Sequence, residues 1–264
     1  MRRRPSTRLS SVLLTVFAIL AAGPAVGPAV GAQSLPTPAA LVARHDSIVG
    51  GRAVLAAHQS MRLIGSFTLA AAGIEAPLEI LKVRPNKYIF RSSFGSMGEV
   101  MQGFDGTTAW AIQPGVGPVL LTGAQAEQIA EQADFFGDLH DLSRFSSAET
   151  VGEETFEGRR TYKVRMVRPN GDIVHEFFDA ATGLSAGGSA TVPGPTGLIE
   201  HVSVFSDYKV FDGLGMATRV VQRQPQFEVV LSIVAVEFDS VDERAVALPE
   251  AVRALLPAPD GRRP

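Results

Sequence analysis

From residue 60 onward the chain consists of short runs in which apolar residues recur at every second position, separated by turn signals. In residues 60–69, for example, Leu63, Gly65, Phe67 and Leu69 fall on one face. A period of two is typical of β-strands, because successive side chains point to opposite faces. The dipeptide Asp105-Gly106, between two apolar runs, indicates a hairpin. Since the runs follow one another without alternating helices, they predict a mainly β fold with an antiparallel sheet.

About eleven strands are predicted. They cover residues 60–69, 77–84, 87–94, 99–104, 107–113, 161–168, 172–179, 184–192, 198–208, 216–224 and 226–239. A long antiparallel sheet curls, so we expect a strongly curved half-barrel whose open side is covered by helices.

Three helices are expected to supply that cover. The first spans residues 39–59 and is interrupted at Gly50-Gly51. The second spans residues 123–142, with a capping box made by Thr122 and Gln125. The third spans residues 248–256 and has Pro249 in its first turn.

Two short motifs occur twice. Val83-Arg84-Pro85-Asn86 returns as Val167-Arg168-Pro169-Asn170, and Phe104-Asp105 returns as Phe178-Asp179. The spacing between the two motifs differs, which favours reuse of the same turn chemistry; an internal duplication is the alternative.

The N-terminus has the pattern of a secretory signal peptide. Arg2, Arg3, Arg4 and Arg8 precede an apolar run at residues 12–22, and Val30-Gly31-Ala32 then offers a cleavage site before Gln33. The apolar run is too short to span a membrane comfortably. We therefore predict a signal peptide at residues 1–32, cleaved near Ala32, and a single exported domain at residues 33–264 in the periplasm. An uncleaved N-terminal anchor is the alternative.

The composition excludes several classes of protein. There is no cysteine, so a lipobox, thiolate metal sites and cysteine catalysis are excluded, and a domain of this size needs no disulfide to hold a core. Of 24 basic and 27 acidic residues the leader holds four arginines and no acid, which leaves 20 against 27, a net charge of −7. Such an acidic domain is not expected to bind nucleic acid.

No residue pattern points to catalysis. The segment His175-Glu176-Phe177-Phe178-Asp179 resembles a zinc-protease motif, but on a strand its first and last residues lie about 13 Å apart. The acidic group Asp134, Asp138, His140 and Asp141 could collect a metal ion; we favour the solvated end of a helix. There is neither a nucleophile elbow nor a dinucleotide fingerprint. We therefore predict no enzymatic activity, no metal and no cofactor, and a hydrolase with scattered catalytic residues is the weakest alternative.

Several strands carry apolar residues on both sides, as in Leu78, Ile80, Leu81 and Val83. A solvated antiparallel face would be mostly polar, so part of this surplus is expected to line an apolar cavity. The predicted lining residues are Phe67, Tyr88, Phe90, Trp110, Tyr162, Met166, Phe177 and Phe205.

Element order and sequence texture from about residue 40 to 255 resemble the LolA/LolB-like periplasmic lipoprotein carriers and the outer-membrane lipoprotein-sorting proteins similar to them. The features that carry the resemblance are the leader, the first helix, the meander from Met61 to Phe94, the turn from Phe104 to Trp110, the middle helix and the hairpin from Tyr162 to Leu184. The resemblance implies a soluble carrier, which we expect to be a monomer, that holds an acyl chain or a lipid-modified protein in its apolar cavity. The alternative is an envelope accessory or stress-sensing module that binds a protein partner.

Overall fold

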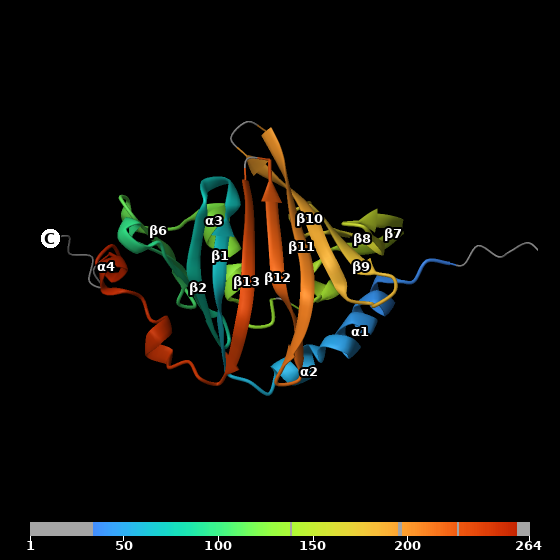
Figure 1. The fold of residues 1–264 in the computed structure, drawn as a ribbon, viewed down its shortest axis with the longest axis horizontal. Coiled ribbons are helices and arrows are strands. Elements are labelled where there is room, and N and C mark those ends of the chain that lie inside the picture. Colours follow the sequence, from blue (N-terminus) through green and yellow to red (C-terminus); the bar gives the residue numbers. More distant parts are fainter. Residues whose placement is uncertain (1–33, 138, 195–196, 226, 258–264) are drawn as a thin grey trace, which may run out of the picture. The chain divides into compact units, whose positions relative to one another are not determined.

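The structure, a computed structural model, describes residues 34–257 except 138, 195, 196 and 226. In this part of the chain thirteen antiparallel strands form a single sheet (Figure 1). The strands are β1 (Ser60–Leu69), β2 (Ile74–Val83), β3 (Lys87–Ser93), β4 (Glu99–Phe104), β5 (Ala109–Gln113), β6 (Gly117–Leu120), β7 (Ser147–Phe156), β8 (Arg159–Val167), β9 (Ile173–Asp179), β10 (Ser185–Gly194), β11 (Gly197–Phe211), β12 (Leu214–Gln224) and β13 (Phe227–Phe238).

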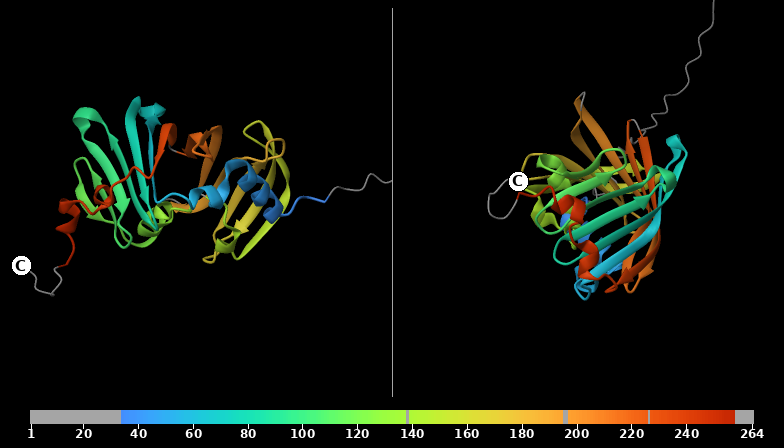
Figure 2. Two further views of the ribbon diagram at one scale, coloured as in Figure 1. Left: turned by 90° about the horizontal axis from the view of Figure 1, so that it is seen from below. Right: turned by 90° about the vertical axis from the view of Figure 1, so that its left-hand side faces the viewer.

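The first and last strands along the chain, β1 and β13, lie side by side in the middle of the sheet. The strand order is β6-β5-β4-β3-β2-β1-β13-β12-β11-β10-β9-β8-β7, so β1 to β6 run outward to one edge and β7 to β13 return from the other. Within each meander consecutive strands pair as hairpins, and the pairing of β1 with β13 joins the two meanders. The predicted antiparallel sheet is confirmed, and the sheet is open and strongly curved along its width (Figure 2).

A β-bulge lies at the junction of the two meanders. Ile64 pairs with Ala235 and Gly65 with Ile233, which leaves Val234 without an opposite residue and 70% exposed. Bulges increase the local twist of a sheet. Gly65 is required here for space, because a Cβ on it would collide with the backbone carbonyl of Ser232.

Replacing Gly65 by alanine is therefore expected to lower the free energy of unfolding by about 2 kcal/mol, since β13 must move away from β1 to relieve the collision. Chemical denaturation followed by circular dichroism would measure the change. Ser66→Ala, one residue along β1, is the matched control and should change stability by no more than about 0.5 kcal/mol. Equal stability of the two variants would contradict the steric argument.

The sequence does not predict strands β6 and β7, which form the two edges of the sheet. β6 contains Pro118, which suggests a loop in the sequence; β7 carries Glu149, Glu153 and Glu154 and is interrupted by a bulge between Thr150 and Gly152. Charges, proline, bulges and short length are the usual means of preventing an edge strand from pairing with another molecule. The features that protect these edges thus also remove the alternation by which strands are recognised.

The helices are shorter than predicted. They are α1 (Pro38–Val49), α2 (Gly51–Leu55), α3 (Gly123–Ala133) and α4 (Glu250–Arg253), with 3₁₀ turns η1 (Ala70–Ala72), η2 (Gly95–Met97), η3 (Leu142–Arg144) and η4 (Glu243–Val246). The predicted break between α1 and α2 is confirmed, with Gly50 at φ +84°. In the described residues none of the helices is long and apolar enough to cross a membrane.

The second helix ends nine residues before its predicted end at residue 142, and the predicted capping box is wrong. Thr122 is the N-cap residue of α3, but its side chain makes no capping hydrogen bond. After Ala133 the backbone extends at Asp134, and the Phe135 N–H donates to the Pro85 carbonyl at 3.1 Å. Phe135 is thereby placed in the core, where its side chain is fully buried. Burial of an aromatic ring outweighs the few helical hydrogen bonds that are lost.

The recurring Phe-Asp motif forms turns of the same kind in two places. Asp105 accepts hydrogen bonds from the N–H groups of Thr107 and Thr108, and Asp179 accepts them from Ala181 and Thr182. The first turn joins β4 to β5 and the second joins β9 to β10. These are aspartate turns of identical geometry, in line with reuse of turn chemistry.

The two faces of the β2–β6 half of the sheet are covered by different segments. Tyr88 and Ala109 share one face, here called the inner face, and pack against Ile129 and Ala133 of α3. On the outer face, Ile89 and Trp110 pack against Val246 of η4 and Val252 of α4; Leu81, Val83 and the half-buried Met101, Ile112, Leu120, Val241 and Leu248 complete this cluster. Both faces of this half are therefore apolar and covered.

Candidate functional site

The inner face of the central strands carries an apolar floor. Its fully buried part combines strand residues with Leu55 of α2 and with Phe135; the strand residues are Met61, Leu63, Leu78, Leu214 and Ile233. Around this core lie residues that are only partly buried, namely Phe67, Ile80, Phe90, Met216, Leu231, Val236 and Phe238. The inner face is therefore still apolar where the helices do not cover it.

The segment that follows α3, residues 134–137 and 139–144, covers part of this floor and is here called the cover loop. Phe136 and Leu139 pack on the core, and the guanidinium groups of Arg52 and Arg84 lie 4.8 and 5.2 Å from the centre of the Phe136 ring. Arg52 also forms an ion pair with Asp141 at 3.2 Å. Exposed contacts of these kinds contribute about 1 kcal/mol or less each, so they hold Phe136 and Asp141 only weakly to Arg52 of α2 and to Arg84, which follows β2.

A buried polar cluster holds α1 against the other half of the sheet. His45 of α1 stacks on His140 of the cover loop with ring centroids 4.6 Å apart, and its Nδ1 accepts a hydrogen bond from the Ser185 N–H at 3.1 Å. His140 Nε2 lies 3.0 Å from Glu176 Oε1, and Tyr208 donates to the Ser185 carbonyl at 3.0 Å. Leu41, Val164, Met166 and Phe178 form an apolar cluster next to it, and the Phe178 ring contacts both histidines.

Burial determines the charge state of this cluster. Desolvation, with a smaller effect of the nearby His140, lowers the pKa of His45 to about 4, so the ring is neutral and can act as an acceptor. Desolvation, together with the Glu176 carboxylate, raises the pKa of Tyr208, so its phenol keeps its proton. Burial also raises the pKa of Asp46, whose Oδ1 has no hydrogen-bond partner in the described residues.

The cluster does not have the geometry of a catalytic triad. The Ser185 hydroxyl donates to Glu176 Oε1, the same oxygen that contacts His140. In a Ser-His-Asp triad the serine hydroxyl is instead hydrogen-bonded to the histidine, which takes its proton. The hydrogen bond from the Ser185 N–H to His45 instead positions α1 against β10.

The residues of the two sequence patterns that resemble metal sites make hydrogen bonds and ion pairs within the protein instead. His175 to Asp179 lie in β9, as predicted for a strand, and the Asp179 carboxylate is engaged by its own turn. In the acidic group, Asp134 pairs with Arg144, Asp141 with Arg52, and His140 with Glu176. Asp138 lies outside the described residues. Among the residues that the structure describes, no cluster of three or more histidines and acids could hold a metal ion.

The eight predicted lining residues are divided between several surfaces. Phe67 and Phe90 border the central apolar floor, and Tyr88 lies beside them under α3. Tyr162 and Met166 belong to the cluster beneath α1, and Phe177 stacks on Phe156 with ring centroids 4.0 Å apart. Phe205 is half-buried in β11. Trp110 lies on the outer face beneath the C-terminal segment. The eight residues therefore do not share one cavity wall, because neighbouring strand positions face opposite sides.

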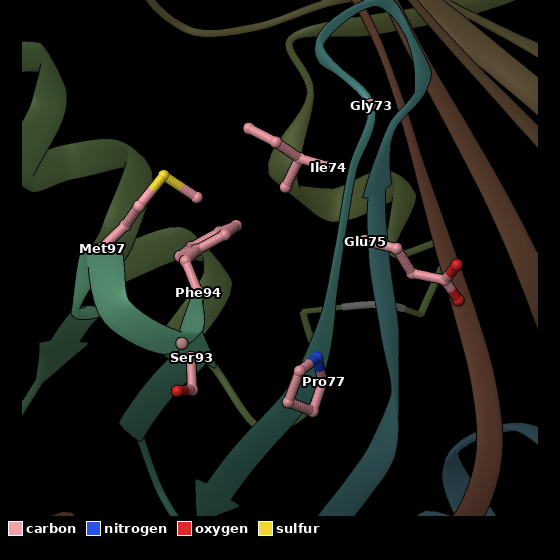
Figure 3. A pocket seen from close by; sticks show the side chains of 8 residues that line it. Gly73, Ile74, Glu75, Pro77, Ser93, Phe94 and Met97 are labelled. Atoms are coloured by element: carbon pink, nitrogen blue, oxygen red, sulfur yellow. The ribbon is translucent and has the colours of Figure 1, made fainter.

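A pocket of about 540 Å³ opens where β2 and β3 separate (Figure 3). Ile74, Phe94 and Met97 point into it, and the Phe94 ring meets the edge of Phe67 at 5.9 Å between centroids. The pocket is therefore continuous with the apolar floor through Phe67. Its remaining lining residues are Gly73, Glu75, Pro77, Ser93 and Gly95. Sequence reasoning missed this pocket, and the only signal for it was the Phe94-Gly95 sequence that ends a predicted strand.

A second pocket of about 350 Å³ lies between α1 and the cover loop. Its walls include Val42 and Asp46 of α1, Arg52 of α2, and His140 and Leu142. This pocket lies where α1 and the cover loop meet.

Comparison with solved structures identifies the architecture. A LolA superfamily protein from Nitrosomonas europaea superposes with a TM-score of 0.53 over 81% of this chain and 99% of its own, at 12% sequence identity. The chain has a LolA-like fold. A DUF1329 family protein from Desulfovibrio piger is also similar, with a TM-score of 0.49 at 13% identity over 78% of this chain and 94% of its own. No protein-family model matches the chain, and no curated protein matches it by sequence. The resemblance predicted from the sequence is thus confirmed at the level of the LolA-like fold.

Proposed function

We propose that the mature protein is a non-catalytic periplasmic binding protein that holds an acyl chain, free or attached to a protein, on its inner apolar face. The observation that carries this proposal is the ring of half-buried residues around the core, including Phe67, Phe90 and Leu231, which continues into the pocket at Phe94. A LolA-like fold with such a floor suits burial of a flexible apolar ligand.

The binding energy would come from desolvation alone. Each methylene moved from water to an apolar surface contributes about 0.8 kcal/mol, so a long chain needs no charged anchor. Phe136 and Leu139 of the cover loop would move aside to admit the chain, since they lie on the floor and the contacts of Phe136 with Arg52 and Arg84 are weak. Phe135 and His140 would remain in place, because both are held by buried contacts.

Export is part of the proposal and rests on the leader. Residues 1–33 lie outside the described residues, so the basic start, the apolar run and the small residues before Gln33 remain the support for it. The expected monomer, the absence of a nucleic-acid partner and the absence of a cofactor also remain predictions.

Binding of a fluorescent fatty acid to residues 33–264 tests the proposal. We expect saturable binding of dansyl-undecanoic acid, weakened about tenfold or more in Phe67→Asp, because a carboxylate on the floor opposes burial of the chain. Val210→Asp, at a site in β11 that is 70% exposed, is the control and should bind like the wild type. Absence of binding in the wild type, or equal binding by the two variants, would reject the proposal.

A further inference from the structure

Four of the ten residues of strand β2 have a neighbouring strand on one side only. Residues Ile74 to Pro77 pair with β1, from Ile74 opposite Leu69 to Pro77 opposite Ser66. Pairing of β2 with β3 begins at Leu78 opposite Ser92. Beyond Ser93 the chain turns away into η2, which leaves the space seen between the two segments in Figure 3. This space, bounded by Gly73 to Pro77 and Ser93 to Met97, is here called the β2 gap.

The backbone of Glu75 faces the β2 gap. In an antiparallel strand the N–H and C=O groups of alternate residues point to opposite neighbours. The Ser92 hydroxyl donates to the Pro77 carbonyl at 2.9 Å, so residue 77 faces β3. Glu75 is two residues away and therefore presents both its N–H and its C=O to the same side, where the ladder with β3 has ended. The β2 gap thus offers one complete pair of backbone groups.

The side chains around the β2 gap differ on its two faces. Ile74, Phe94 and Met97 lie on the pocket side, and Met97 is 60% exposed. The carboxylate of Glu75 points the opposite way from Ile74, and it makes no ion pair within the described residues. The next acidic residue of β2, Glu79, is by contrast engaged by both Arg62 and Arg91.

We propose that the β2 gap binds an extended segment of a partner protein in which a lysine or arginine lies between two apolar residues. The central residue would exchange two backbone hydrogen bonds with Glu75 and thereby add a short strand to β2. Directly opposed residues share a face, so its basic side chain would lie beside the Glu75 carboxylate, as favourable cross-strand pairs do. The residues on either side would point to the other face and enter the pocket of Ile74, Phe94 and Met97.

A peptide fits these features better than an acyl chain does. An acyl chain could fill the apolar side of the β2 gap, but it would leave the N–H and C=O of Glu75 without partners in a space from which it excludes water. It would also make no use of the Glu75 carboxylate. The proposed peptide site adjoins the acyl-binding floor at Phe94, whose ring contacts Phe67.

Fluorescence polarisation with short blocked peptides tests the proposal. The probe is a labelled pentapeptide with lysine between two valines and serine at each end; the comparison peptides carry glutamate instead of lysine, or serine instead of both valines. We expect the lysine peptide to bind about tenfold more tightly than the glutamate peptide to the wild type, and the serine peptide to bind at least as weakly as the glutamate peptide. Methylation of the central backbone nitrogen should abolish binding.

Reversal of charge makes the test specific. In Glu75→Lys the preference should invert, so that the glutamate peptide binds more tightly. Glu149→Lys, at an exposed position of edge strand β7, is the matched control and should keep the wild-type preference. Because Glu75 is exposed, both variants should fold, which circular dichroism would verify. Three outcomes would overturn the proposal. The first two are equal binding of the peptides to all three proteins and absence of peptide binding. The third is displacement of the bound peptide by lauric acid with equal potency in the wild type and in Glu75→Lys.

Discussion

Replacing Phe135 by alanine is expected to lower the free energy of unfolding by about 4 kcal/mol. The side chain is fully buried and packs with Leu55, Met61 and Leu78, so its removal leaves a cavity at the centre of the inner face. Phe135 also anchors the start of the cover loop through its backbone hydrogen bond to Pro85. Chemical denaturation monitored by circular dichroism would measure the loss.

A phenylalanine at the surface supplies the control for this variant. Phe227 is 41% exposed at the start of β13, and its replacement by alanine should cost about 1 kcal/mol or less. If Phe135→Ala were destabilised no more than Phe227→Ala, the assignment of Phe135 as the central anchor would be wrong.

The second large effect is a loss of stability below neutral pH. The pKa of His45 is about 4 in the folded protein, lowered from 6.5. The unfolded chain therefore takes up this proton first as the pH falls, and protonation favours unfolding. The contribution of His45 to the free energy of unfolding is complete above pH 6.5. It is lost between pH 6.5 and pH 4, by about 3 kcal/mol in total. Urea denaturation at a series of pH values would show this slope.

His45→Gln separates this contribution from those of other groups. Glutamine can accept the Ser185 N–H bond without titrating, so the variant should lose less stability than the wild type between pH 6.5 and pH 4. Burial also lowers the pKa of His175 and of His201, which contribute a residual slope of the same sign in the variant, whereas the raised pKa of Asp46 contributes one of opposite sign. Parallel curves for the two proteins would show that His45 is not the titrating group.

Much of the fold could be predicted, because the alternation of apolar and polar residues is a local property. It located eleven of the strands and the break at Gly50, and it implied an open, curved antiparallel sheet. It failed at β6 and β7, where protection of an edge replaces alternation with proline and glutamates. It also extended α3 too far, because the helical pattern cannot show that Phe135 is drawn into a distant core.

The candidate site was less predictable. Most of the predicted lining residues lie in apolar clusters, but the period of two does not reveal which face is the inner one. Trp110 and Phe90 are equally good candidates in the sequence, yet the first lies beneath the C-terminal segment and the second beside the core of the inner face. The His45 cluster unites residues of α1, the cover loop and strands β9, β10 and β11, and no motif marks it.

The sequence by itself determined the strands, the turns between them and the family resemblance, because these depend on neighbouring residues and on backbone chemistry that repeats along the chain. The tertiary structure alone decided the order of the strands, the assignment of faces, the place of the cover loop and the separation of β2 from β3. Those features depend on which distant residues meet. The pairing of β1 with β13 and the burial of Phe135 against both meanders are settled by packing across the whole sheet.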